Sequence, residues 1–105
     1  MLTVRDASDK PLSLLANYSL HYVGGVPALS ADYFGAFGGL IGPKLGAKDK
    51  DFVGILSNGT SGDVNNVNFG APAVKFGPGE RIKVVAESVA KEAAAAYAKI
   101  EYASD

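Results

Sequence analysis

Two short apolar runs separated by a helix-like segment constrain this 105-residue chain more than any other feature of its sequence. The first run, LSLLANYSL at 12–20, and the second, FVGIL at 52–56, have the length and composition of buried strands. Large apolar residues recur between them at helical spacing: Tyr33, Phe34, Phe37, Leu40 and Ile41. A strand, a helix and a strand in this order predict a parallel pair joined by a right-handed crossover.

The ends of the central helix carry their own signals. Ser30 is expected to cap it, and Asp32 suits the positive end of the helix dipole. Pro43 and Gly46 are expected to end it. Three interior glycines weaken the helix by roughly 1 kcal/mol each relative to alanine; they are Gly35, Gly38 and Gly39. This helix therefore needs tertiary packing, and its small residues allow a neighbour to approach closely.

The two ends of the chain complete the predicted fold. LTVRD and LSLLANYSL flank the polar turn ASDKP, which predicts a hairpin over about Leu2–Leu20. A long helix is expected from about Pro78 to Tyr102, with Glu87 and Lys91 paired on its solvent side. Its apolar stripe is expected at Ile82, Val85, Val89, Ala93, Ala96 and Ile100. The fold class is thus α/β: a small layered fold with a β-hairpin, a βαβ unit and a long C-terminal helix packed on a short mixed sheet.

Composition excludes several classes of function. With 48% hydrophobic and 20% charged residues, residues 1–105 fit a single α/β domain, which we expect to be a fragment of a larger one. Ten basic residues against eleven acidic ones, without a basic cluster, give no footprint for nucleic acid. The chain has no cysteine, and no apolar run reaches the roughly 20 residues of a transmembrane helix.

The apolar character of both strands predicts self-association. Strands of parallel sheets normally have cover on both faces, and two helices do not provide it. We therefore expect a homo-oligomer that buries either a sheet edge or the apolar face of 78–102.

Polar residues follow both strands of the predicted parallel pair. His21 comes directly after the first, and SNGTSGDVNN at 57–66 follows the second. Because ligands gather beyond the carboxyl ends of parallel strands, these residues are expected to share a site. Two plainer alternatives stay open: His21 is a hydrogen-bonded structural residue, or the loop is a turn in which glycine permits positive φ and Asn or Asp bonds the backbone.

The segments ANYSLHYVGG, ALSADYFGAF and FVGILSNGTSGDVNNVNFGAP together resemble part of the catalytic domain of the neutral/alkaline (non-lysosomal) ceramidase family, over about Leu12–Pro72. The resemblance implies a zinc-dependent amidohydrolase that acts on lipid amides such as ceramide. It makes His21 a zinc ligand and matches Ser30 and Asp32 to a Ser-x-Asp element that opens the helix. The family has a loop with an Asn and then Gly-Asp/Asn-x-Ser-Pro-Asn, and the resemblance matches this loop at Asn58, Gly62, Asp63 and Val64.

The chain departs from this family at two places. Asn65 stands where the family has its nucleophilic serine, and Asn66 stands where it has the following proline. The catalytic candidates are therefore Asn65 by position, Ser61 as the nearby hydroxyl and Asp63 as the carboxylate.

The substrate-binding candidates are Asn58, Gly62 and Asn66. The family completes its zinc with a second histidine, a glutamate and a tyrosine, and this sequence has one histidine. We expect the isolated chain to be inactive and to hold no zinc stably; the alternative is a noncatalytic relative that binds a polar ligand or assembles with itself.

Overall fold

The computed structural model describes residues 1–26, 29–48 and 50–102. These residues form a three-stranded mixed sheet and two helices: β1 (Leu2–Arg5), β2 (Pro11–Tyr18), α1 (Asp32–Lys44), β3 (Val53–Asn58) and α2 (Glu80–Tyr97). The strand order is β1-β2-β3, with β1 antiparallel and β3 parallel to β2. The predicted fold class, with its hairpin, parallel pair and C-terminal helix on the sheet, is confirmed.

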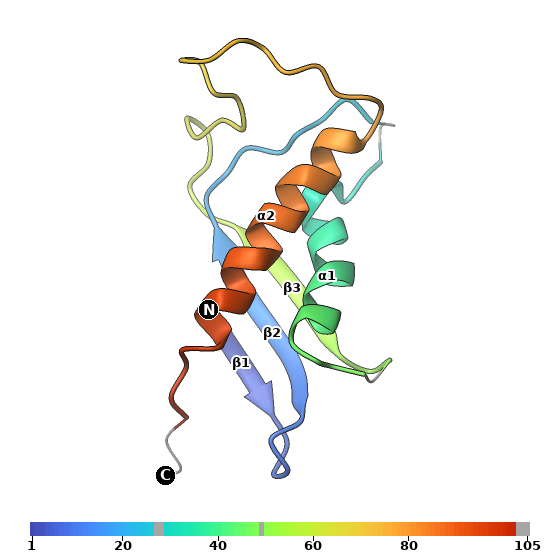
Figure 1. Ribbon diagram of the computed structural model, residues 1–105, viewed down its shortest axis with the longest axis vertical. Helices are drawn as coiled ribbons and strands as arrows, with labels where there is room; N and C mark the ends of the chain where they lie inside the picture. Colours follow the sequence, from blue (N-terminus) through green and yellow to red (C-terminus); the bar gives the residue numbers. More distant parts are fainter. Residues whose placement is uncertain (27–28, 49, 103–105) are drawn as a thin grey trace.

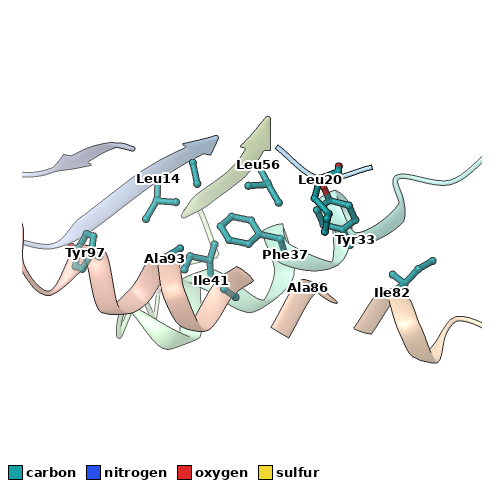
Figure 2. Packing of buried hydrophobic residues seen from close by; sticks show 12 residues of the cluster. Leu14, Leu20, Tyr33, Phe37, Ile41, Leu56, Ile82, Ala86, Ala93 and Tyr97 are labelled. Carbon is teal, nitrogen blue, oxygen red and sulfur yellow. Dashed lines mark hydrogen bonds between the residues drawn. The ribbon is translucent and has the colours of Figure 1, made fainter. Parts of the chain in front are cut away.

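Both helices lie on the same face of the sheet, so that the molecule has two layers (Figure 1). The core fills the space between the layers (Figure 2), and alternation along the strands turns Leu14, Ala16 and Leu56 into it. Its buried members are Leu14, Ala16, Leu20, Tyr33, Phe37, Ile41, Leu56, Ile82, Ala86, Ala90, Ala93 and Tyr97.

The helix α1 begins and ends slightly differently from the expectation. Its N-cap is Ala31, although the Ser30 hydroxyl still accepts the N–H of Asp32 at 3.0 Å. Pro43 lies inside the last turn and does not end the helix. The helix ends at Lys44 with Leu45 as its C-cap; the next residue, Gly46, has φ +73° and donates to the Pro43 carbonyl, while Ala47 donates to the Gly42 carbonyl. This pair of bonds is a Schellman motif, which satisfies carbonyls that the helix leaves open.

One glycine in α1 allows the helix to touch the sheet. A Cβ on Gly38 would lie 2.9 Å from the Gly54 carbonyl oxygen of β3, closer than real side chains come. The helix therefore packs backbone against backbone here, and the glycines that weaken it in isolation are needed for its tertiary contact.

The buried stripe of α2 is rotated from the predicted one. Ala86 and Ala90 are fully buried, whereas Ala96 is exposed. The helix α2 packs closely on α1 and also shares the core with the sheet (Figure 2). Its small residues therefore lie where the two helices approach each other. The ion pair seen for Glu87 is with Lys44 of α1, at 2.7 Å, and not the expected one with Lys91.

The other face of the sheet is uncovered in the described part of the chain. The register places Leu2, Leu15 and Ile55 in one row across the strands, and Val4 and Val53 in the next row with Ser13 between them. All five apolar side chains are exposed. Helices thus cover the apolar strands on one face of the sheet only. The apolar face of α2, which was a candidate interface with a second copy, lies in the core.

Neither helix among the described residues has the length and apolarity needed to cross a membrane.

Candidate functional site

The loops that leave the carboxyl ends of β2 and β3 meet, as expected from the parallel pairing. The N–H of His21 donates to the Val64 carbonyl at 2.8 Å, and the N–H of Gly59 donates to the Tyr18 carbonyl at 3.2 Å. Residues about 40 apart in the sequence are therefore joined by backbone hydrogen bonds. The site candidates are the segment His21–Gly24, named here the His21 segment, and the loop 58–66, named here the polar loop.

The polar loop is stabilised in part by its own side chains. The Asn58 amide donates to the Ser61 hydroxyl at 2.8 Å. Ser61 is half-buried, while Gly62, Asp63 and Asn65 are exposed. Asn58 and Ser61 thus have a structural use in the loop, whereas Asp63 and Asn65 present their polar groups to solvent.

Asn66 links the polar loop to the His21 segment. Its amide nitrogen lies 3.2 Å from the carbonyl oxygens of both His21 and Tyr22. Both partners only accept hydrogen bonds, so the amide must face them with its NH₂ group. The backbone carbonyl of Asn66 in turn accepts from the guanidinium of Arg81 in the first turn of α2. Asn66 therefore connects the His21 segment to the start of α2.

Asp32 holds the same segment from the side of α1. One oxygen of its carboxylate accepts the N–H of Val23 at 3.0 Å, and the other accepts the N–H of Gly24 at 2.9 Å. The first oxygen also accepts the N–H of Tyr33 at 2.7 Å. Gly24 has φ +72°, so the chain turns here in a conformation that glycine adopts without strain.

Tyr33 fixes the residue that precedes His21. Its buried hydroxyl donates to the Leu20 carbonyl at 2.7 Å. Burial, with a further contribution from the negative charge of Asp32, raises the pKa of Tyr33 to about 12. The phenol therefore stays protonated, and remains a donor, over the ordinary pH range.

The imidazole of His21 is half-buried and is oriented by its neighbour. Nδ1 lies 3.0 Å from the Tyr22 carbonyl oxygen, and the two rings pack with centroids 4.3 Å apart. Because a carbonyl only accepts, Nδ1 must carry the proton, which leaves the lone pair of the neutral ring on Nε2. A metal-binding histidine commonly has this arrangement.

The described residues do not gather a full set of zinc ligands around His21. No group of three or more His, Asp or Glu side chains lies close enough together there to hold a metal ion. His21 suits one position of a zinc site, but stable zinc sites use three or four protein ligands. The residues present therefore do not fit a complete zinc centre.

A cavity of about 370 Å³ flanks the site, between the His21 segment and the start of α2. Its walls include Val23, Gly24 and Arg81. Arg81 also packs over Phe76, with 5.4 Å between its guanidinium carbon and the ring centroid. A polar group entering this cavity would meet a guanidinium that is already held in place.

The sequence did not predict that Asp32, Tyr33 and Asn66 hydrogen-bond the backbone at and just before the His21 segment, or that Arg81 binds the carbonyl of Asn66. The sequence motifs include Asp32 and Asn66, but the contacts of these two residues join segments that lie apart in the chain. The local signal for Asp32 is the Gly24–Gly25 pair upstream of it, which indicates a tight turn that needs side-chain partners. Nothing in the sequence around Arg81 indicates its contact with Asn66.

The structure is thus a two-layer α/β fold with a candidate polar site at the carboxyl edge of its parallel strands. No family model, curated protein or solved structure matches the chain.

Proposed function

We propose that the His21 segment and the polar loop of this chain form one side of a ceramidase-like amidohydrolase centre. Alone, the chain binds zinc weakly at these residues and does not hydrolyse an amide. The observation that carries the proposal is the hydrogen bond between His21 and Val64, which joins the histidine to the polar loop. The tautomer of His21 leaves Nε2 free for a Lewis acid or an acidic proton. In the same proposal, exposed Asp63 and Asn65 line the path of a lipid amide.

Hydrolysis by the chain alone is not expected, for two chemical reasons. An amide side chain such as that of Asn65 cannot act as the nucleophile that a serine provides. The Ser61 hydroxyl receives its hydrogen bond from Asn58 and has no histidine partner among the described residues that would activate it. The missing zinc ligands would have to come from outside these residues.

The first test is metal binding by the isolated chain. Zinc is expected to bind weakly, with changes in backbone amide shifts confined to the His21 segment and the polar loop, because one imidazole supplies one ligand. Replacing His21 by alanine should abolish these changes. A short-chain ceramide incubated with the chain should release no fatty acid. Stoichiometric tight zinc binding, changes centred elsewhere, or fatty-acid release would each contradict the proposal.

A second function, self-association, is favoured by the uncovered face of the sheet. Its five apolar side chains together expose on the order of 400 Å², an area within the range of the largest patches on monomers. Two copies packed face to face would bury twice that apolar area, and with the polar rim the interface would exceed about 1,000 Å² in total. We therefore take a second copy of this chain as the occupant, and the pair as a sandwich of two sheets.

The test of self-association compares two substitutions at sites of matched exposure. Ile55 on the uncovered face is 49% exposed, and Val84 on α2 is 47% exposed. Ile55→Lys is expected to convert a dimer into a monomer at micromolar concentration, because it places a charge within the apolar interface. Val84→Lys should leave the dimer intact. Sedimentation showing that the unmodified chain is monomeric, or that both variants dissociate equally, would refute this interface.

A further inference from the structure

The His21 segment belongs to no helix or strand, yet each of its four residues makes at least one backbone hydrogen bond to Asp32, Val64 or Asn66. Two of its carbonyls accept from Asn66, one N–H donates to Val64, and two more N–H groups donate to Asp32. Just before it, the Leu20 carbonyl accepts from Tyr33. Five hydrogen bonds from two separate elements thus fix four residues that belong to no helix or strand.

Such a dense set of bonds exceeds what chain reversal alone requires. A tight turn commonly has a single local hydrogen bond, and Gly24 already provides the left-handed conformation at which this chain turns. The additional bonds come from the side chains of Asp32 in α1 and Asn66 in the polar loop, which lie 9 and 45 residues further along the chain than their respective partners, Val23 and His21. Side chains that restrain a loop in this way are typical of supports for a functional group.

The group that these bonds support is the imidazole of His21. Nδ1 is held against the carbonyl of Tyr22, and that carbonyl is one of the two that Asn66 binds. The N–H of the next residue, Val23, is bound to Asp32. The peptide group between Tyr22 and Val23 is therefore clamped at its oxygen by Asn66 and at its nitrogen by Asp32, and this clamped peptide presents the acceptor that selects the His21 tautomer.

We infer that Asn66 and Asp32 are positioning residues for His21, which hold the Tyr22–Val23 peptide so that Nδ1 keeps its proton and Nε2 keeps its lone pair. Asn66 then acts through the backbone of the His21 segment and not by binding substrate directly. The role rests on the proposed function, because a fixed tautomer matters only where Nε2 contacts a ligand.

The test reads the tautomer without metal or substrate. Nitrogen-15 correlation spectra of the His21 ring at about pH 9, above the usual histidine pKa, distinguish Nδ1–H from Nε2–H. The unmodified chain should be mainly Nδ1–H. Asn66→Asp keeps the shape of the side chain but turns a carboxylate toward two carbonyls, so the ring should change to mainly Nε2–H, the form that a free side chain favours.

The matched control is Asn68→Asp, two residues beyond the end of the polar loop. Asn68 uses its side-chain oxygen to accept the N–H of Gly70, and an aspartate retains that bond. This variant should keep the Nδ1–H form. If Asn66→Asp does not fold, Asp32→Asn replaces it. The NH₂ group of the new amide would face a backbone N–H of Val23 or Gly24, so one of the two hydrogen bonds with Asp32 would be lost.

The results of this experiment and of the zinc titration can be separated. An unchanged tautomer in a folded Asn66 or Asp32 variant, or an equal change in the Asn68 variant, would overturn the positioning role whatever zinc does. A change restricted to the Asn66 and Asp32 variants would support that role even if zinc failed to bind at His21, which would count against the proposed function alone.

Discussion

Replacing Gly54 by valine is expected to destabilise the fold by about 3 kcal/mol or more, at the upper end of the usual cost of overpacking. A Cβ at this position would overlap the Ile41 side chain, which is fully buried, and would lie 3.1 Å from the Gly38 carbonyl oxygen. Neither neighbour can retreat without separating α1 from β3. The higher strand propensity of valine offsets only up to about 1 kcal/mol of this cost. Urea denaturation followed by circular dichroism measures the difference.

The contact of Gly54 is with Gly38 of α1, and the neighbouring Gly39 serves as the control. Gly38→Ala brings a Cβ against the Gly54 carbonyl and should destabilise the chain, whereas a Cβ on Gly39 meets nothing within 4 Å. Gly39→Ala should therefore stabilise it by up to about 1 kcal/mol, through helix propensity. Equal effects at the two neighbouring glycines would show that α1 and β3 do not approach as closely as described.

Replacing Phe37 by alanine is expected to cost about 3–5 kcal/mol of the free energy of unfolding, as for other fully buried phenylalanines. Phe37 is 0% exposed and lies between the sheet and the helices, next to Leu56 and Ile41 (Figure 2). Because a domain of this size has about 5–15 kcal/mol of stability in total, much of the variant should be unfolded at moderate temperature. Thermal denaturation measures the shift.

The matched control is Phe34→Ala in the same helix. Phe34 is only half-buried and stacks on Tyr33 with ring centroids 4.0 Å apart. It loses less burial when truncated, so its cost should be clearly smaller than that of Phe37. Similar losses at both positions would mean that the core does not centre on Phe37.

Much of the fold was predictable because it depends on local patterns. The apolar runs at 12–20 and 52–56 indicated strands, and the helical spacing between them indicated the connecting helix. Parallel pairing follows from that order, and it alone predicted that His21 and the loop after β3 share one edge of the sheet. The roles of the individual site residues stay predictions.

The details that were wrong depend on packing between elements. Periodicity gives the width of an apolar stripe, but it does not say which small residues meet a neighbouring helix, so the burial of Ala86 and Ala90 was missed. Pro43 was expected to end α1, yet a proline in the last turn costs little when a Schellman motif follows it.

The sequence by itself determined which segments become strands and helices, and in which order they pair, because these properties depend on residue periodicity and turn chemistry within short windows. Only the tertiary structure decided that both helices cover one face of the sheet, leaving Leu15 and Ile55 exposed on the other. It also decided that Asp32 and Asn66 meet at the Tyr22–Val23 peptide. The physical reason is that these features depend on how the helices, the sheet and the loops pack together in space, whereas a local residue pattern determines only the type of each segment and the faces it can offer.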